Sequence, residues 1–283
     1  MRVLITGAAG QLGRALIAST PPGLHVTGVD LADFDIGDED EVARAVAALY
    51  PDLIINAAAY TAVDKSESEP DLAYRVNRDA VRHLAQAALK GGAKLVHIST
   101  DFVFDGQASR PYAPDAATHP LGVYGASKLA GEQEALATGG LVIRTAWLYS
   151  AAGANFLLTM LRLFNERPLV RVVADQIGTP TSAASLALAV WGWAQANATG
   201  VHHVTDAGAA SWYDFAVAIK EEGADLGLCP ADVVVEPIRT EDYPTPARRP
   251  AYSVHDKTSA WSLLGGPARH WREELRMTQQ ELR

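Results

Sequence analysis

Cysteine, long hydrophobic runs and positive charge are all scarce in this chain of 283 residues. Its one cysteine, Cys229, excludes a disulfide within the chain and a cysteine-rich metal site, and it indicates a reducing compartment. No apolar run approaches the ~20 residues that a membrane span requires. The apolar run at residues 3–5 is too short for a signal peptide. We therefore expect a soluble, cytoplasmic protein with no membrane partner.

Basic residues are outnumbered, with 24 Lys and Arg against 33 Asp and Glu, for a formal charge of −9. The chain has no cationic cluster beyond pairs such as Arg248-Arg249. This distribution is not that of a nucleic-acid-binding protein. It leaves room for an anionic small molecule, because backbone dipoles at a helix N-terminus can bind phosphate.

The histidines do not form a metal-binding pattern. His202 and His203 are adjacent in a predicted strand, so their side chains point to opposite faces. His83 and His97 have no acidic or cysteine partner at ligand spacing. We expect no metal site.

What the chain does contain, over residues 1–150, is an alternation of short apolar runs with longer amphipathic stretches. Compact apolar runs predict strands that are covered on both faces. The predicted strands are residues 2–6, 25–29, 53–56, 94–99 and 141–145, and the predicted helices are residues 11–19, 39–49, 71–89 and 123–136. The pattern predicts an α/β fold with a Rossmann-type, doubly wound parallel sheet, which binds ligands at the carboxyl ends of its strands.

The pattern changes after Trp147. Predicted helices at 156–165, 182–196 and 212–221 and strands at 170–173 and 202–205 are followed by a proline-rich loop near residue 246. We expect a smaller C-terminal substrate lobe, partly interleaved with the sheet. The predicted division is a dinucleotide-binding domain at 1–150, with a return contribution from 170–200, and a mainly substrate-binding lobe at 151–283.

A glycine-rich turn follows the first predicted strand and opens the first helix. Gly7, Gly10 and Gly13 are spaced G-x-x-G-x-x-G, with Gln11 and Leu12 between the last two. Glycines allow the backbone to approach a pyrophosphate, which then lies at the helix N-terminus. The spacing is typical of short-chain dehydrogenases; the alternative is an ordinary tight turn between strand and helix.

Three further segments end at the expected cofactor edge. Asp30 closes the second strand, where a carboxylate can accept hydrogen bonds from the adenosine ribose and would repel a 2′-phosphate, which favours NADH over NADPH. Asp35 and Ile36 could flank the adenine or form an ordinary loop. The run from Asn56 to Tyr60 contains three alanines, which leave room for a flat group or simply pack beneath a helix.

Thr100, Tyr124 and Lys128 form the expected catalytic set. Tyr124 and Lys128 are four residues apart and share one helix face, where an ammonium can lower a phenol pKa from its usual value near ~10. Thr100 ends the fourth strand, where its hydroxyl can orient a carbonyl group. Tyr124 would then donate a proton to the substrate while a nicotinamide supplies the hydride. Taken singly, these residues could be a strand-end cap and a surface pair.

Six segments resemble the dTDP-4-dehydrorhamnose reductase family of extended short-chain dehydrogenases. They are Gly7–Gly13, residues 56–70, residues 99–104, Tyr124–Lys128, Arg144-Thr-Ala-Trp147 and residues 243–250. The resemblance extends over nearly the whole chain. It implies NAD(P)H-dependent reduction of the C4 ketone of dTDP-6-deoxy-L-lyxo-4-hexulose to dTDP-L-rhamnose, the last step of dTDP-rhamnose biosynthesis.

The resemblance also implies site residues. The implied catalytic residues are Thr100, Tyr124 and Lys128. The implied cofactor-binding residues are Gly7, Gly10, Gln11, Leu12, Gly13, Asp30, Asp35, Ile36, Ala59, Tyr60, Thr61, Tyr124 and Lys128. The implied substrate-binding residues are Thr100, Asp101, Tyr124, Trp147, Asn155 and Arg249, with Thr179 and Pro180 as further candidates. The Trp147 ring would offer a flat face to the hexose, and the charge of Arg249 suits a diphosphate.

Two positions depart from the family pattern. Phe102 stands where relatives often have tyrosine, and Ala15 stands where some carry a glutamate that joins subunits through magnesium. We therefore expect a monomer or homodimer without a metal-bridged interface. Two alternative functions remain: another nucleotide-sugar reductase or epimerase, or a regulatory subunit resembling the β subunit of methionine adenosyltransferase. The complete catalytic set favours an enzyme, because a binding module needs no proton donor.

Overall fold

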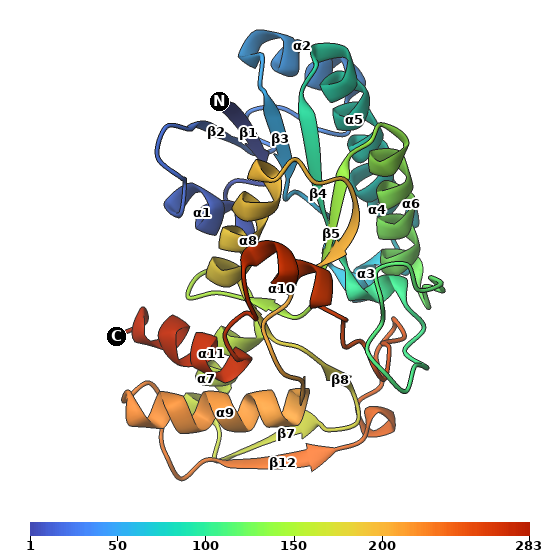
Figure 1. Ribbon diagram of the computed structural model, residues 1–283. Coiled ribbons are helices and arrows are strands. Elements are labelled where there is room, and N and C mark those ends of the chain that lie inside the picture. Colours follow the sequence, from blue (N-terminus) through green and yellow to red (C-terminus); the bar gives the residue numbers. More distant parts are fainter.

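A six-stranded parallel sheet forms the centre of the computed structural model, which describes residues 1–283 (Figure 1). Its strands, in spatial order, are β10 (Gly200–His203), β5 (Leu141–Thr145), β4 (Lys94–Thr100), β3 (Leu53–Asn56), β1 (Arg2–Thr6) and β2 (His25–Val29). Every neighbouring pair is parallel. The predicted Rossmann-type sheet is confirmed, and its strand order reverses between β1 and β3, the switch point where such sheets bind ligands.

Helices cover both faces of the sheet. The helices on one face are α1 (Gln11–Ala18) and α8 (Ala183–Gln195), and those on the other are α2 (Glu39–Leu49), α5 (Ala80–Gly91) and α6 (Val123–Ala137). The alternation of β1 produces this division: Val3 and Ile5 pack with α1 and α8, whereas Leu4 packs with α2 and α5. Successive side chains of a strand point to opposite faces, so each face acquires its own core.

The predicted helix at 71–89 is not continuous. It consists of α4 (Pro70–Tyr74), a π-helical turn η1 (Arg75–Asp79) and α5. Such turns insert an extra residue into the helix and often occur at functional sites. This one carries the buried Asn77, which contacts the expected cofactor loop.

The smaller lobe lies at the carboxyl ends of the sheet strands (Figure 1). Its strands β7 (Leu169–Val173) and β12 (Val234–Ile238) pair in parallel. Its helices are α7 (Phe156–Glu166), α9 (Trp212–Asp225) and α11 (Trp271–Gln280). They enclose a second apolar core that includes Tyr149, Phe164, Phe215 and Trp271. None of the helices combines the length and apolar character needed to cross a bilayer.

The chain passes between the two parts more than once. After β7 it returns to the sheet as α8 and β10 and then re-enters the lobe as α9. The remaining elements are two short strand pairs, two small α-helices and two 3₁₀ helices: β6 (Leu148–Tyr149) with β9 (Thr181–Ser182), β8 (Ile177–Gly178) with β11 (Ala210–Ser211), α3 (Val63–Ser66), α10 (Thr258–Leu264), η2 (Asp101–Val103) and η3 (Thr240–Asp242). The strand expected at 202–205 is displaced and occupies Gly200–His203, because its register is set by pairing with β5.

Candidate active site

The glycine turn at the end of β1 is too closely packed for side chains. Gly7 has φ +71, and a Cβ there would lie 2.7 Å from the backbone nitrogen of Ala58. A Cβ at Gly13 would lie 2.2 Å from the Gly7 carbonyl oxygen. Gly10 is the N-cap of α1 and provides no side-chain cap. The unsatisfied N–H groups of α1 therefore lie at the carboxyl ends of β1 and β3, the arrangement that binds a pyrophosphate.

Asp30 is attached to this turn. Its Oδ2 accepts a hydrogen bond from the backbone N–H of Ala9 at 2.6 Å. Arg14 Nε donates to the carbonyl oxygen of the same Ala9 at 2.7 Å. Asp30, which we expected at the adenosine ribose, and the Arg14 guanidinium thus both hydrogen-bond to the backbone of Ala9 in the turn.

Asp35 and Ile36 both have structural partners. The Asp35 carboxylate accepts from Arg75 Nη2 at 2.5 Å and from the Gly37 backbone N–H at 2.7 Å. The carbonyl oxygen of Ile36 lies 3.3 Å from His83 Nδ1. Any contact of these two residues with adenine remains a prediction.

The loop with Ala59, Tyr60 and Thr61 is held by Asn77, which the sequence analysis did not single out. Asn77 Oδ1 accepts from the Tyr60 backbone N–H at 2.9 Å, and its Nδ2 donates to the Tyr60 carbonyl oxygen at 3.1 Å. Nδ2 also donates to Ser127 Oγ of α6 at 3.0 Å. A buried amide within a helical apolar pattern was the available signal, because such an amide requires partners.

Thr100, Asp101 and Tyr124 come together where β4 ends against the first turn of α6. The Phe102 backbone N–H donates to Thr100 Oγ1 at 3.2 Å, and Thr100 Oγ1 donates to Asp101 Oδ1 at 3.1 Å. A Cβ at Gly125 would lie 2.2 Å from the Phe102 carbonyl oxygen, so α6 rests directly on this backbone. The Phe102 ring meets Tyr124 edge to face, with centroids 5.4 Å apart. These contacts fix the position of the phenol.

The proton-active groups of this cluster have shifted pKa values. Burial raises the pKa of Tyr124 to about 12; the Thr100 hydrogen bond acts in the opposite direction and the charge of Asp101 adds to the rise. Burial lowers the pKa of Lys128 to about 8, opposed by Glu132. Burial also raises the pKa of Asp101 to about 6, opposed by the nearby hydroxyls of Ser253 and Thr100, of which Thr100 donates to Asp101 Oδ1 at 3.1 Å.

The expectation that Lys128 lowers the pKa of the Tyr124 phenol is not met in this structure. Lys128 Nζ donates to the carbonyl oxygen of Ile98 at 2.6 Å and lies 3.4 Å from His97 Nε2. The ammonium thus contacts β4, and burial has the largest effect on the pKa of the Tyr124 phenol. Sharing a helix face does not determine the direction of a long side chain.

Trp147 differs from the expectation of a free flat face. Its indole stacks on Trp212, with ring centroids 3.6 Å apart and planes 6° apart. A Cβ at Gly178 would lie 2.5 Å from Trp147 Cε2. Trp147 also has φ +49, a conformation that costs energy for a residue with a bulky side chain. One face of the ring is therefore occupied by the protein itself.

Asn155 joins the lobe to the glycine turn. It caps α7 by accepting from the Leu158 backbone N–H at 3.0 Å. Its Nδ2 donates to Gln11 Oε1 at 3.0 Å, and Ser150 Oγ donates to the same oxygen at 2.9 Å. Gln11, which we expected at the cofactor, and Asn155, which we expected at the substrate, are thus direct neighbours.

Arg249 is not a free cation. Its Nη2 lies 2.9 Å from Asp64 Oδ2, and its Nη1 donates to Asp64 Oδ1 at 3.1 Å. This guanidinium holds the pKa of Asp64 below its usual range. Thr179 is buried and donates to the Gly208 carbonyl oxygen at 3.1 Å, next to Pro180. A diphosphate contact by Arg249 would compete with Asp64.

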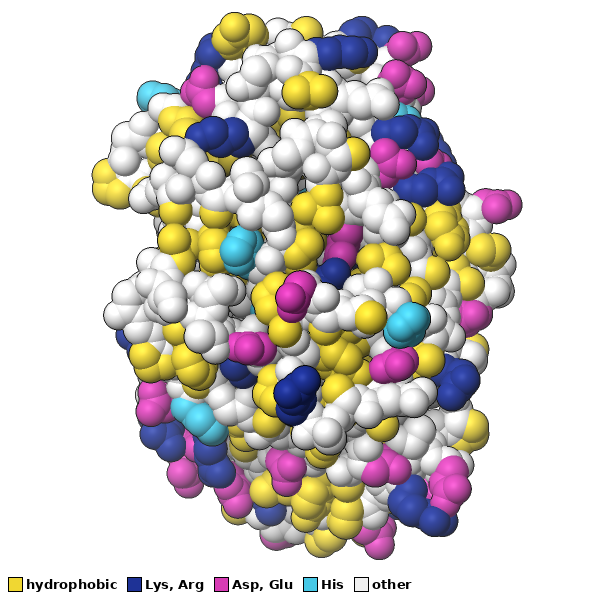
Figure 2. Space-filling model, turned by 45° about the vertical axis from the view of Figure 1, so that its right-hand side comes forward, with side chains coloured by type: hydrophobic (Ala, Val, Ile, Leu, Met, Phe, Trp, Pro, Cys, Tyr) yellow, Lys and Arg dark blue, Asp and Glu magenta, His cyan; other side chains and the backbone are white.

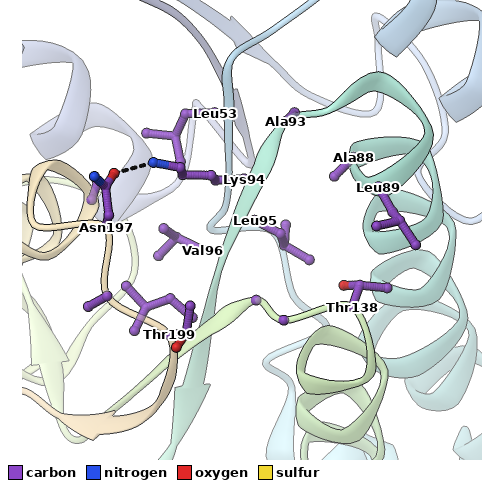
Figure 3. A pocket seen from close by; sticks show the side chains of 15 residues that line it. Leu53, Ala88, Leu89, Ala93, Lys94, Leu95, Val96, Thr138, Asn197 and Thr199 are labelled. Atoms are coloured by element: carbon purple, nitrogen blue, oxygen red, sulfur yellow. Dashed lines mark hydrogen bonds between the residues drawn. The ribbon is translucent and has the colours of Figure 1, made fainter.

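The cavity in Figure 3 lies at the opposite, amino-terminal end of the strands. It is lined by the first residues of β3, β4 and β5, namely Leu53, Lys94 and Leu141, with Lys94 hydrogen-bonded to Asn197. None of the expected site residues lines it. Ligands of open α/β sheets bind at the other end, so we do not place the active site here.

The surface carries no continuous basic region on the face shown in Figure 2, where acidic and basic side chains are interspersed. No group of three or more His, Cys, Asp or Glu side chains is positioned to hold a metal ion.

Comparisons with known proteins agree with this arrangement. A family model described as the RmlD substrate binding domain matches residues 1–283. The chain is 40% identical over 285 residues to a dTDP-4-dehydrorhamnose reductase of Aggregatibacter actinomycetemcomitans, covering 97% of each chain. The crystal structure of a dTDP-4-dehydrorhamnose reductase from Clostridium acetobutylicum superposes with a TM-score of 0.94 at 40% identity, covering 100% of this chain and 99% of the other.

A second solved structure includes a cofactor. The dTDP-4-dehydrorhamnose reductase of Bacillus anthracis, in complex with NADP, has a TM-score of 0.92 at 38% identity, and 99% of each chain is covered. These matches span the sheet and the lobe together. The chain therefore belongs to the RmlD substrate binding domain family, together with the dTDP-4-dehydrorhamnose reductases.

Proposed function

We propose that this protein is an NAD(P)H-dependent oxidoreductase that reduces the C4 ketone of dTDP-6-deoxy-L-lyxo-4-hexulose to dTDP-L-rhamnose. The observation that carries the proposal is that Tyr124 is buried against Phe102, which closely follows Thr100 at the end of β4, one helical turn before the buried Lys128. A proton donor fixed in this way needs a hydride source nearby, and the glycine turn of the same sheet suits a dinucleotide. The names of the relatives that match across the chain support the same reaction.

We assign the roles as follows. Thr100 orients the ketone oxygen, Tyr124 donates the proton to it, and Lys128 holds the nicotinamide ribose. Asp101 contacts the sugar; its Oδ2 is buried without a hydrogen-bond partner, which a sugar hydroxyl would supply. The hydride itself is the chemistry of the cofactor.

The glycine turn and the loop held by Asn77 are the proposed cofactor site, and Trp147, Asn155 and Arg249 are the proposed substrate contacts of the lobe. Residues 1–150 would bind the dinucleotide with a return contribution from 170–200, and 151–283 would mainly bind substrate. The packing of α8 and β10 onto the sheet supports this division.

We propose that either nicotinamide cofactor is used, with Asp30 favouring NADH. Its carboxylate would repel a 2′-phosphate, and its bond to Ala9 keeps it at the turn. The ratio of kcat/KM with NADH to that with NADPH tests this preference, and Asp30→Ala should shift the ratio toward NADPH. An unchanged ratio in that variant would contradict the role of Asp30.

The reaction is tested by following NAD(P)H oxidation in the presence of the hexulose. Tyr124→Phe should reduce kcat by roughly 10²–10⁴-fold, the range of general acid catalysis. Tyr213→Phe, in α9 of the lobe, is the matched control and should retain activity. Activity that is retained in Tyr124→Phe would contradict the role of Tyr124 as the general acid.

The alternative functions are not favoured, because the relatives that match along the whole chain are named as reductases. An epimerase would convert a nucleotide sugar without net NAD(P)H consumption, so the same assay separates the two. A cytoplasmic location and a monomer or metal-free homodimer remain predictions; light scattering measures the second.

A further inference from the structure

A chain of four buried polar side chains runs through the sheet behind the active site. It consists of Thr6 of β1, Asn56 of β3, His97 of β4 and Lys128 of α6, with exposed fractions of 1%, 0%, 0% and 2%. The links are Thr6 Oγ1 to Asn56 Oδ1 at 2.7 Å, Asn56 Nδ2 to His97 Nδ1 at 3.1 Å and His97 Nε2 to Lys128 Nζ at 3.4 Å. Buried polar groups are costly unless their donors and acceptors match, so the direction of each link can be deduced.

The orientation of the Asn56 amide follows from a backbone group. The Ala58 N–H can only donate, and it points at Asn56 Oδ1 at 3.2 Å. That oxygen also accepts from the Thr6 hydroxyl. The opposite side of the amide is therefore its NH₂ group, which donates to His97 Nδ1.

The tautomer of His97 follows in turn. Burial, together with the charge of Lys128, holds the pKa of His97 well below its usual range, so the ring is neutral. A neutral imidazole has one N–H, and because Nδ1 accepts from Asn56, the proton resides on Nε2. This Nε2–H faces Lys128 Nζ.

An ammonium group has three N–H donors and no acceptor, whereas a neutral amine has a lone pair. We propose that His97, with its tautomer fixed by Asn56, presents an N–H to Lys128 and thereby favours the neutral amine over the ammonium. His97 is a positioning residue in this arrangement, because it acts through Lys128. Its catalytic consequence rests on the proposed function, but the tautomer and the lysine charge belong to the protein alone.

Few other charged groups act on Lys128. Glu132 of the same helix favours the ammonium. Its charge is matched by Arg144 of β5, at 2.8 and 2.7 Å, and it accepts from Ser99 Oγ at 2.6 Å. Tyr124, on the preceding turn, stays a neutral phenol because burial raises its pKa to about 12. On β4, the Ile98 carbonyl oxygen at 2.6 Å accepts from the lysine and favours the ammonium, whereas the donor of His97 at 3.4 Å favours the amine.

A lysine that exchanges its proton near neutral pH can resupply Tyr124. In each turnover the phenol gives its proton to the oxygen of the reduced ketone and becomes a phenolate. An ammonium at Lys128 can return a proton to that phenolate once its Nζ leaves the Ile98 carbonyl oxygen, and it then regains a proton from solvent. A permanently charged lysine could not complete this cycle.

The test uses the full chain, labelled with ¹⁵N-histidine and with ¹³Cε-lysine, observed by NMR without substrate or cofactor. His97, assigned by the loss of its signals in His97→Phe, should be neutral and protonated on Nε2, and the Lys128 Cε signal should titrate near pH 8, well below an ordinary lysine. A wild-type ring protonated on Nδ1 would overturn the proposal directly.

Asn56→Asp then changes the tautomer, because a carboxylate accepts but does not donate. The His97 proton should move to Nδ1, Nε2 should accept from the ammonium, and the Lys128 titration should rise by about one pH unit or more. A rise without a change of tautomer would assign the shift to the new charge and reject the role of His97. Thr6→Val is the control, because the Ala58 N–H still orients Asn56, and both signals should stay as in the wild type.

Enzyme kinetics provide a separate readout. In Asn56→Asp the alkaline limb of the kcat profile should move with the NMR titration of Lys128. If the protein does not turn over the hexulose, the reductase proposal fails while the NMR result still decides the role of His97. A titration that moves while the kinetic limb of an active enzyme stays fixed would remove Lys128 exchange from the catalytic cycle.

Discussion

The sheet and the smaller lobe bury their charged side chains in different ways. Glu132 of α6 and Arg144 of β5 form an ion pair in which both side chains are buried, and the sheet also buries the polar chain that ends at Lys128. The lobe core is aromatic and aliphatic, with Phe215 and Trp271 among its members, and the buried carboxylates of the lobe, Glu222 and Glu274, pair with arginines that stay partly exposed. Directional hydrogen bonds hold a reacting group in one orientation, whereas apolar contacts fill volume. The difference fits the proposed division, in which the sheet supplies the chemistry and the lobe supplies shape.

The largest effect should come from Lys128→Met, which removes the amine at the end of the polar chain. We expect kcat to fall by roughly 10²–10⁴-fold, the contribution of a positioned proton-transfer group, and the pH profile to shift to higher pH. Lys94→Met, at the amino-terminal end of β4, removes the same kind of side chain outside the site and should leave kcat unaltered. Equal losses in both variants would contradict a specific role for Lys128.

Arg144→Met tests the buried charge of the sheet. It leaves Glu132 buried without its partner, and breaking such a pair costs about 3–5 kcal/mol of unfolding free energy. Urea denaturation measures the change. The double variant Arg144→Met with Glu132→Leu should recover much of the loss, because no unpaired charge remains. A single variant as stable as wild type would show that the pair is not structurally important.

Phe215→Leu is the matching change in the lobe. Phe215 is fully buried and packs against Tyr149 and Phe156. Because this substitution leaves no buried polar group without a partner, we expect the unfolding free energy to fall by about 1–2 kcal/mol, less than in Arg144→Met. Denaturation under the same conditions gives the comparison. A larger loss here than in Arg144→Met would reverse the contrast between the two regions.

A pH-dependent effect is expected from Asp206, next to the sheet–lobe connection, whose Oδ2 accepts from the Ser182 backbone N–H at 2.8 Å. Burial raises the pKa of Asp206 to about 7, opposed by the Ser185 hydroxyl and by the Ser182 backbone N–H. The folded state therefore keeps a proton that the unfolded state releases near its ordinary pKa of about 4. Unfolding free energy should fall as pH rises from about 4 to 7.

Asp206→Asn should flatten this dependence, since an amide does not titrate. Thermal denaturation at several pH values, with Asp242→Asn at an exposed position as the control, measures the slope. A slope that is identical in Asp206→Asn and wild type would assign the pH dependence to other groups.

Much of the sheet could be predicted from the sequence because most of its strands are short runs rich in Val, Ile and Leu between turn residues. β1, β2, β3 and β5 occur at the predicted residues. The strand β12 was not predicted, because a proline such as Pro237 disfavours a strand. Because β12 pairs only with β7, the proline nitrogen, which cannot donate a hydrogen bond, interrupts no second strand pairing. The helices α10 and α11 were also missed.

The site was less predictable than the fold. The motif indicated Thr100, Tyr124 and Lys128, but not that Lys128 Nζ would turn to the Ile98 carbonyl oxygen. The pairing of Arg249 with Asp64 was hidden as well, because it joins residues far apart in the sequence. Spacing along a helix predicts which residues are neighbours; the direction of long side chains depends on acceptors that only the tertiary structure supplies.

The shared acceptor at Gln11 has a mechanical consequence. Its one amide oxygen accepts hydrogen bonds from Ser150 of the lobe and from Asn155, the N-cap of α7, so the beginnings of α1 and α7 are joined. The lobe cannot swing away from this corner unless both bonds break, at a net cost of roughly 1 kcal/mol each. Gln11 lies in the turn that is proposed to bind the pyrophosphate. Binding of a dinucleotide at this turn is therefore coupled to the position of the lobe through the Gln11 side chain.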